Sequence, residues 1–410
     1  MTIIEFYDKT AIENIAGAMI CRPEQVILIG NNKKQMKKSC ETYQRILRNN
    51  GITTDLKYAV IERDSLSGIV DGLDKLVSGL NECIFDITGG DDLYLVAVGV
   101  LMERYKGRVD CHRFNFDSET IVDCDADGDV AVAKSFNISV DDSIAIYGGE
   151  LLLDAEVGLS TYDWSFDGEF LADVDKLWSI CRDDPGGWNS QIAIISRIYD
   201  EYCEEGSLHI SYDVNRVNRE FGKGQRPCYV NERLLEDLQS YGLIKSLYLG
   251  ERISFEFKNE QVKRCLTVSG QVLELLIARR LLGISTEQRQ PLYNDVRVGA
   301  VIRWDDDSVD DGMSIVNEID VIAMKGAIPV FISCKNGNVT VDELYKLSTV
   351  AERFGGTYAK KVLVTSNLAR SNSNSAYLKA RMEEMGIVHI DNLYGASKHE
   401  LERVLANVWK

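Results

Sequence analysis

The sequence lacks the features of a secreted or membrane-spanning protein. No apolar run approaches the roughly 18–20 residues needed to cross a bilayer. The first residues, MTIIEFYDKTAIEN, contain no basic segment followed by an apolar one, as a signal peptide would. The ten cysteines form no CxxC pair, which predicts reduced, mostly buried thiols instead of a disulfide framework or a zinc site. We therefore expect a cytoplasmic protein.

Basic residues and histidines are also few. Lysine and arginine total 46 against 64 aspartates and glutamates, so the formal net charge is −18. A protein that coats duplex DNA by releasing counterions is usually basic over its binding domain, and this balance argues against that class. It does not exclude a nuclease, whose metal site needs carboxylates. The four histidines are scattered, which argues against a histidine-rich metal site.

The composition is that of a folded protein, with 45% hydrophobic and 27% charged residues among 410. This length predicts two to four domains, and the pattern favours three. We interpret 1–150 as a Rossmann-like domain and 151–174 as a linker, because acidic and glycine-bearing stretches replace the regular pattern there. Residues 175–265 form a connecting module, and 266–410 form a last α/β domain.

Strands and helices are expected to alternate in the first domain. EQVILIG (24–30) and CIFDITGG (83–90) are short apolar runs that end in glycine and precede helical patterns. This order predicts an open parallel sheet that binds a ligand at the carboxyl ends of its strands. In the connecting module, helices precede two short strands around a turn at Gly250-Glu251, and Ile253, Phe255 and Phe257 alternate along the second strand. Helices followed by such a ribbon predict a winged-helix-like module.

The last domain is expected to have the order αβββαβ, and two of its strands carry reactive side chains. Residues two apart on a strand share a face, so NEIDV places Glu318 beside Asp320, and FISCK places Ser333 beside Lys335. Carboxylates suit Mg²⁺ or Mn²⁺, and a lysine beside them is suited to phosphodiester hydrolysis. The alternative is a set of surface ion pairs. The strongly apolar strands (IPVFI, IDVIAM) argue against it, because unpaired charge is costly on a central strand.

This arrangement resembles the PD-D/ExK restriction-endonuclease-like superfamily. The resemblance implies that Asp320 binds the metal and that Lys335 is the lysine of the ExK element. Glu274, in the helical run QVLELL, matches the helical glutamate of many members. Ser333 replaces the ExK glutamate, and Glu318 is the carboxylate that could substitute for it, so the metal ligands would be Asp320, Glu318 and Glu274. Farther on, Thr340-x-x-Glu343 has the spacing of a helix capping box, and Lys346 follows it.

The first domain resembles a CARF domain, the sensor of cyclic oligoadenylates in type III CRISPR defence. The residues that carry this resemblance are LIGNN after the first apolar run and DITGG before a later helix; no GxGxxG follows a strand. Acidic Asp91-Asp92 follow the glycines, where a phosphate would be repelled but a ribose hydroxyl or a helix N-terminus could be bound. The residues expected to bind ligand are Gly30, Asn31, Asn32, Thr88, Gly89, Gly90 and Asp91.

Together, the three segments resemble the CARF-nuclease effectors. That resemblance implies a homodimer activated by cyclic tetra-adenylate, with Mg²⁺ or Mn²⁺ as the cofactor and DNA or RNA as the substrate. Two other functions stay open. One is a ligand-responsive transcription regulator with an inactive nuclease segment, favoured by Ser333 and by a basic run over 215–219 with Lys223 and Arg226. The other is an enzyme that processes nucleotides in its first domain.

Overall fold

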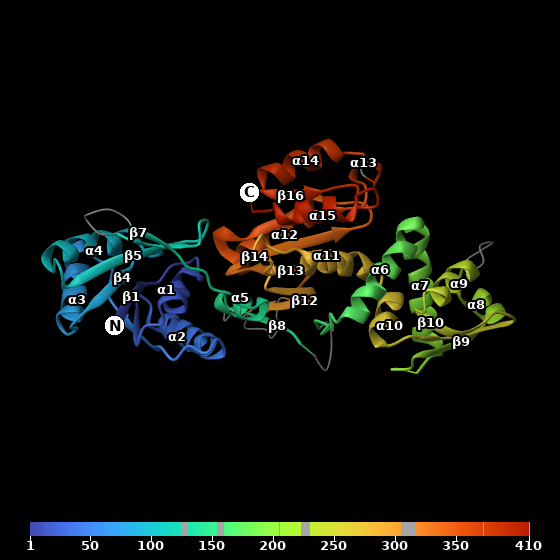
Figure 1. Ribbon diagram of the computed structural model, residues 1–410, viewed down its shortest axis with the longest axis horizontal. Coiled ribbons are helices and arrows are strands. Elements are labelled where there is room, and N and C mark those ends of the chain that lie inside the picture. Colours follow the sequence, from blue (N-terminus) through green and yellow to red (C-terminus); the bar gives the residue numbers. More distant parts are fainter. Residues whose placement is uncertain are drawn as a thin grey trace.

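The computed structural model describes residues 1–124, 130–153, 160–204, 206–222, 230–304, 316–371 and 373–409. Figure 1 shows an elongated molecule with three units in a row. The N-terminal unit (β1–β7 with α1–α4) lies at one end. The three-stranded unit (α6–α10 with β9–β11) lies at the other end, and the C-terminal unit (α5 and β8, then α11–α15 with β12–β16) lies between them.

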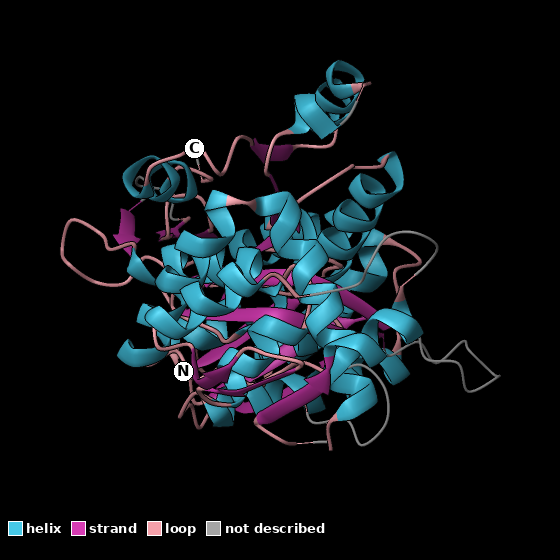
Figure 2. Ribbon diagram, turned by 90° about the vertical axis from the view of Figure 1, so that its right-hand side faces the viewer, coloured by secondary structure: helices cyan, strands magenta, loops and turns pink. Residues whose placement is uncertain are grey.

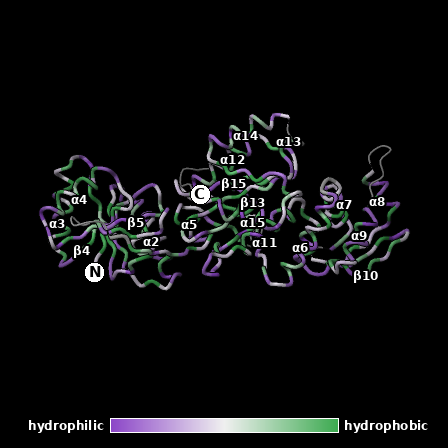
Figure 3. Tube along the Cα trace, turned by 45° about the horizontal axis from the view of Figure 1, so that its top comes forward, coloured by the Kyte–Doolittle hydropathy of each residue, from purple (hydrophilic) through white to green (hydrophobic). Residues whose placement is uncertain are grey.

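Strands lie inside the molecule and helices cover them in the view along its long axis (Figure 2). Hydrophobic stretches follow the strands, and hydrophilic ones are more frequent toward the periphery (Figure 3). Among the described residues, no helix combines the length and the apolar character that a membrane crossing requires. The nine described cysteines are free thiols, and six of them are buried.

The sheet of the N-terminal unit has the order β3-β2-β1-β4-β5-β6-β7. Its first five strands in that order are parallel, and β6 and β7 extend it in antiparallel fashion. The expected parallel, Rossmann-like sheet is confirmed. The elements are β1 (Thr2–Phe6), α1 (Glu13–Cys21), β2 (Gln25–Gly30), α2 (Lys33–Asn49), β3 (Asp55–Val60), α3 (Leu66–Ser78), β4 (Cys83–Asp86), α4 (Asp92–Arg104), β5 (Val109–Asn115), β6 (Thr120–Asp123) and β7 (Val130–Ala133).

The central strand, β1, is not among the strands expected from the sequence. Its five residues, TIIEF, are too few to show a period and contain a glutamate. In the structure β1 lies between β2 and β4 and pairs in parallel with both. The strand order reverses there, so the carboxyl ends of β1, β2 and β4 border one crevice. Open α/β sheets bind their ligands in such a crevice.

Glu5 of β1 places a carboxyl group in the interior of this sheet. It is 1% exposed, and its Oε1 accepts a hydrogen bond of 3.2 Å from the backbone N–H of Ala18. Burial, followed by the charge of Asp86, raises the pKa of Glu5 well above its ordinary value. Gly17 leaves the space for both acids, because a Cβ there would lie 2.3 Å from Asp86 Oδ2 and 2.6 Å from Glu5 Oε1.

The C-terminal unit contains a six-stranded sheet in the order β16-β15-β14-β13-β12-β8. β12, β13 and β14 are antiparallel, and β14, β15 and β16 are parallel. From α11 onward the order is the expected αβββαβ with an extension. The elements are α5 (Val140–Ile146), β8 (Gly149–Leu151), α11 (Gln271–Gly283), β12 (Asp295–Trp304), β13 (Val316–Lys325), β14 (Ile328–Lys335), α12 (Val341–Gly355), the 3-10 turn η1 (Gly356–Tyr358), β15 (Lys360–Thr365), α13 (Leu368–Ser371), α14 (Ser375–Glu384), β16 (Ile387–Ile390) and α15 (Lys398–Ala406).

The segment expected to be a linker, 151–174, begins inside this sheet. Leu151 is the last residue of β8, which pairs with β12, and Leu153 forms an isolated bridge with Thr161. From Gly168 the chain is helical. The strand β8 could not be recognised in this acidic, glycine-bearing sequence, because its pairing partner β12 is about 150 residues farther along the chain. Residues 154–159 lie outside the described residues.

The three-stranded unit has a sheet of order β10-β11-β9. From α7 to β11 the elements follow the order helix, strand, two helices and two strands. Ile253, Phe255 and Phe257 point inward as expected, with at most 3% exposed. The strand β9 was not expected from the sequence. The elements are α6 (Gly168–Asp183), α7 (Pro185–Tyr202), β9 (His209–Asp213), α8 (Val214–Phe221), α9 (Glu232–Ser240), β10 (Ile244–Tyr248), β11 (Arg252–Phe257) and α10 (Glu260–Thr267).

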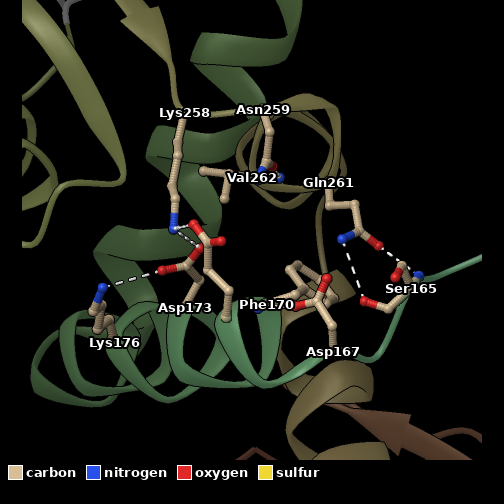
Figure 4. Close-up of polar contacts among 10 residues, drawn as sticks. Ser165, Asp167, Phe170, Asp173, Lys176, Lys258, Asn259, Gln261 and Val262 are labelled. Carbon is tan, nitrogen blue, oxygen red and sulfur yellow. Dashed lines mark hydrogen bonds and ion pairs between the residues drawn. The ribbon is translucent and has the colours of Figure 1, made fainter.

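A buried ion cluster fastens α6 to the chain between β11 and α10 (Figure 4). Asp173 of α6 is fully buried, and its two oxygens lie 2.5 Å from Lys258 Nζ and 3.1 Å from Lys176 Nζ. Nearby, the side chain of Gln261 accepts a hydrogen bond of 2.7 Å from the backbone N–H of Ser165. Because the carboxylate has two cationic partners, its charge is compensated inside the unit.

Glu5→Gln is expected to raise the free energy of unfolding at neutral pH. Below the ordinary pKa of 4.5 the proton on buried Glu5 is present in both states. As the pH rises toward the folded-state pKa, only the unfolded chain releases it, so the wild type loses stability that the uncharged glutamine keeps. Urea unfolding at several pH values between about 5 and 8 measures this difference. The exposed Glu62→Gln is the control, and a difference that does not grow with pH would contradict the prediction.

Candidate functional sites

A cavity of about 280 Å³ lies at the carboxyl ends of β1, β2 and β4, where the sheet order reverses. Three of the residues expected to bind ligand line it: Gly30, Asn31 and Asp91. Asn32 has a different role, because its side chain accepts a hydrogen bond from Gln35 N and caps α2. The residues that the sequence analysis missed are Tyr7, Asp8, Lys9, Gln35, Arg63 and Tyr94.

Three of the missed residues follow from the missed strand. Tyr7, Asp8 and Lys9 come directly after β1, and without β1 no sequence signal directs them to the cavity. Gln35 Nε2 donates a hydrogen bond of 2.5 Å to Tyr7 Oη, which links α2 to the end of β1. Tyr94 donates its hydroxyl proton to the backbone oxygen of Ile61 at 2.5 Å, and burial raises its pKa to about 12.

Asp91 has the capping role that the sequence analysis offered as one alternative. Its Oδ1 accepts a hydrogen bond of 3.1 Å from Leu93 N at the start of α4. Its Oδ2 lies 2.6 Å from Arg63 Nη1, so the acidic charge at this edge of the cavity is paired with an arginine. An anion that enters the cavity therefore meets a paired carboxylate, which repels it less than a free one.

Thr88, Gly89 and Gly90 support the cavity instead of lining it. Thr88 Oγ1 donates a hydrogen bond to Asp86 Oδ1 and accepts one of 2.8 Å from Phe114 N. The backbone N–H of Gly90 donates to Asp8 Oδ2 at 3.1 Å. Gly89 lies tightly against α1, because a Cβ there would be 2.6 Å from Glu13 Oε2. The loop 88–90 is therefore held by hydrogen bonds to the buried Asp86 and the half-buried Asp8, and it packs against Glu13.

A second cavity, of about 100 Å³, lies in the C-terminal unit and contains the expected hydrolytic residues. β13 and β14 pair antiparallel from Val321–Ile332 to Lys325–Ile328. The next residues on the two strands, Asp320 and Ser333, therefore lie side by side. The cavity is lined by Glu318, Ile319, Asp320, Ser333, Lys335, Glu343, Lys346 and Leu347.

Asp320 is the centre of this second cavity. Its Oδ2 accepts hydrogen bonds from Cys334 N at 2.6 Å and Ser333 Oγ at 3.1 Å, and it lies 3.3 Å from Lys335 Nζ. The Asp320 side chain is 17% exposed and that of Lys335 is 29% exposed. Burial lowers the pKa of Lys335, but the carboxylates of Asp320 and Glu343 raise it more, so its pKa lies above the ordinary value. The lysine is therefore a cation in the groove.

Glu274 on α11 lies near enough to this groove for the charges of the groove to change its pKa. Burial, then the charges of Asp320 and Glu318, raise its pKa to about 8, while Lys335 acts in the opposite direction. Its Oε2 accepts a hydrogen bond of 3.0 Å from Gln271 Nε2. The charges of Asp320 and Glu318 on β13 thus make the buried Glu274 on α11 harder to ionise.

The donor set of this groove fits a hard divalent cation in chemical type, because all three acids offer carboxylate oxygens. In their present positions, however, no three acid, histidine or cysteine side chains of the described residues form a group that could hold a metal. Ser333 contributes a hydrogen bond to Asp320 at the position where the ExK pattern has a glutamate. Glu343 has the expected capping-box geometry with Thr340 and also lines the cavity.

No protein-family model matches the chain, and no curated protein matches it. Two solved structures match it over its whole length. Protein VC1899 from Vibrio cholerae has a TM-score of 0.74 at 17% identity, covering 100% of this chain and 97% of that one. Can2 from Sulfobacillus thermosulfidooxidans, solved in complex with cyclic tetra-adenylate (cA4), has a TM-score of 0.66 at 15% identity, covering 100% and 99%.

The chain has the fold of these two proteins. At such low identity the likeness establishes the arrangement of the units, and the roles of individual residues rest on the geometry of this chain. The first cavity lies at the carboxyl ends of parallel strands, where open α/β sheets bind their ligands. The second lies along β13 and the end of β14.

Thr88→Val is expected to destabilise the N-terminal unit by about 1–3 kcal/mol, because the partly buried N–H of Phe114 and the carboxylate of Asp86 each lose a partner. Thr88→Ser keeps the hydroxyl and should retain most of the wild-type stability. Thermal and urea unfolding of the full-length variants measures both. A loss in Thr88→Ser as large as that in Thr88→Val would contradict the prediction, because the hydroxyl would then contribute no more than the methyl group.

Proposed function

We propose that this chain is a metal-dependent endonuclease that a cyclic oligoadenylate activates, and that it cleaves DNA, RNA or both in type III CRISPR defence. The observation that carries the proposal is the presence in one chain of a crevice in a Rossmann-like sheet and a carboxylate–lysine groove on β13 and β14. A protein of the same full-length fold was solved with cyclic tetra-adenylate, which supports that ring as the activator here.

Each unit then has a role. The N-terminal unit is the CARF-like sensor, and its cavity offers a phosphate-bearing ring the charge of Lys9 and the N-terminal end of α2, which the side chain of Asn32 caps. Tyr7 and Tyr94 add aromatic rings on the same wall. The three-stranded unit is a winged-helix-like connecting module. The C-terminal unit is the PD-D/ExK-like nuclease.

A homodimer suits a ring that is itself symmetric, because each copy then presents the same surface to it. The outer face of α4 supports this assignment. Leu93, Val96 and Val100 follow helical spacing along it and are 41%, 52% and 41% exposed. This apolar stripe begins beside Asp91 and Tyr94, which line the ligand cavity. A second copy on the stripe would bring two ligand cavities close together.

The residues of the groove in the C-terminal unit have different roles in this proposal. Asp320, Glu318 and Glu274 would hold Mg²⁺ or Mn²⁺, which when bound supplies a water of lowered pKa and a positive charge for the phosphate. Lys335 stays protonated beside Asp320 and is placed to stabilise negative charge on a scissile phosphate. Ser333 and the backbone N–H of Cys334 hold the Asp320 carboxylate in the groove.

A transcription regulator is the second candidate, and Ser333 in place of an ExK glutamate is the observation that favours it. The three-stranded unit, whose elements follow a winged-helix-like order, would then recognise DNA. Arg216 of the basic run pairs with Glu220 at 2.9 Å, which leaves it less available to a phosphate. Lys223 and Arg226 lie outside the described residues.

Val96→Asp is expected to convert a dimer to a monomer, because a charge in the centre of the apolar stripe would be buried against the second copy. Sedimentation velocity with and without cyclic tetra-adenylate measures the change. Val132→Asp, at a valine of similar exposure on β7, is the matched control. Dimers of unchanged stability in Val96→Asp would place the interface elsewhere.

Asp320→Asn is expected to reduce cleavage by about 100-fold or more while leaving ligand binding intact, because it removes the central carboxylate of the groove. The assay uses supercoiled plasmid, single-stranded DNA and RNA with Mn²⁺, with and without cyclic tetra-adenylate. Asp342→Asn, at an exposed acid on the first turn of α12, is the control. Ligand binding without cleavage by the wild type under every condition would support the regulator instead.

A further inference from the structure

A chain of contacts connects the loop beneath the ligand cavity to the groove of the C-terminal unit. It starts at Asp8, which lines the cavity and accepts the N–H of Gly90. Asp8 is itself held by α1: its backbone N–H donates to Asn14 Oδ1 at 2.6 Å, and Asn14 Nδ2 donates to its backbone oxygen at 2.9 Å. A phosphate entering the cavity would repel the carboxylate of Asp8, and a shift of that carboxylate would release the N–H of Gly90.

The next contact is between Gly89 and Glu13. A Cβ at Gly89 would lie 2.6 Å from Glu13 Oε2 and 2.9 Å from the Cβ of Asp8. The loop therefore packs directly against the Glu13 side chain. Burial, opposed by its hydrogen bond to Tyr358 and then reinforced by the charges of Asp8 and Asp86, raises the pKa of Glu13 to about 7.

The third contact crosses between the units. Tyr358 donates its hydroxyl proton to Glu13 Oε1 at 2.7 Å, and its ring lies 4.4 Å from that of Phe116 in the N-terminal unit. Tyr358 ends the turn η1, which directly follows α12. The turn packs closely on its neighbours in both units, because a Cβ on Gly356 would lie 2.6 Å from Tyr147 Oη and 3.2 Å from Thr10 Cγ2.

The last element is α12 itself. It has 15 residues and is therefore about 22 Å long. Its C-terminal end leads into Tyr358, and its N-terminal turn brings Glu343, Lys346 and Leu347 into the groove beside Asp320 and Lys335. Glu343 also contributes to the raised pKa of Lys335. One rigid helix thus extends from the contact with the loop to the residues of the hydrolytic groove.

We infer that the hydrogen bond between Tyr358 and Glu13 is a latch that holds α12 in its resting position until ligand displaces the Gly89–Gly90 loop. This inference rests on the proposed function for its ligand and its readout of cleavage. In the resting position Lys335 contacts Asp320, and the three acids of the groove form no metal-holding group among the described residues. When the latch opens, α12 is free to move, and Glu343, Lys346 and Leu347 move with it in the groove.

Tyr358→Phe removes the latch but keeps the ring on Phe116. We expect cleavage without ligand to rise and half-maximal cleavage to need about five-fold less cyclic tetra-adenylate, with an unchanged maximum. Glu13→Ala should behave in the same way. Glu13→Gln keeps an oxygen that can accept the hydrogen bond from Tyr358, so this variant should need as much cyclic tetra-adenylate as the wild type. The control is Glu119→Gln, which breaks another contact between the units, the 3.4 Å ion pair of Glu119 with Lys325.

Hydrogen exchange of the full-length protein tests the latch without any cleavage. Coupling is reciprocal, so Tyr358→Phe should speed amide exchange at Gly89 and Gly90 in the other unit, and Glu119→Gln should not. Unchanged exchange at these glycines, or equal effects of both variants, overturns the latch. A wild type that neither binds the ring nor cleaves overturns the proposed function instead, and the exchange result still decides the latch.

Discussion

The apolar interior is continuous between the N-terminal and C-terminal units, and the arrangement of both cavities depends on it. One cluster of buried residues includes Tyr43 and Ile46 of α2, Ile144 of α5, and Leu347 and Phe354 of α12. Burial of apolar area on this scale favours one relative placement of the two units. The helix α1, against which the loop 88–90 packs, therefore shares this core with α12, which lines the groove of the C-terminal unit.

Charge is handled differently in the two cavities. In the cavity of the N-terminal unit Asp91 is paired with Arg63, and Asp8 accepts a hydrogen bond from a backbone N–H, so both acids have partners there. In the groove Lys335 forms an ion pair with Asp320, while burial and the acidic neighbours raise the pKa of Glu274 to about 8. Such a groove has a surplus of carboxylates, which favours a cation more than an anion.

Much of the C-terminal unit could be predicted from its sequence. Its strands are long enough to show their apolar runs, and the two-residue spacing of Glu318–Asp320 and of Ser333–Lys335 places each pair on one face without knowledge of the fold. Short strands with distant partners could not be predicted. β1 has five residues, β8 has three, and β8 is recognisable only through its pairing with β12. The missing β1 hid the residues at its end, including Asp8.

By itself the sequence determined the alternation of strands and helices, the αβββαβ order and the placing of Glu318 beside Asp320 and of Ser333 beside Lys335. These follow from local periodicity and from residue spacing, which a chain carries whatever its tertiary structure. Tertiary structure alone decided that Thr88 anchors a loop instead of lining the cavity, that Arg63 pairs with Asp91, and that Glu13 meets Tyr358. Those contacts join residues 26 to 345 positions apart, and no local pattern encodes which distant side chain will be the partner.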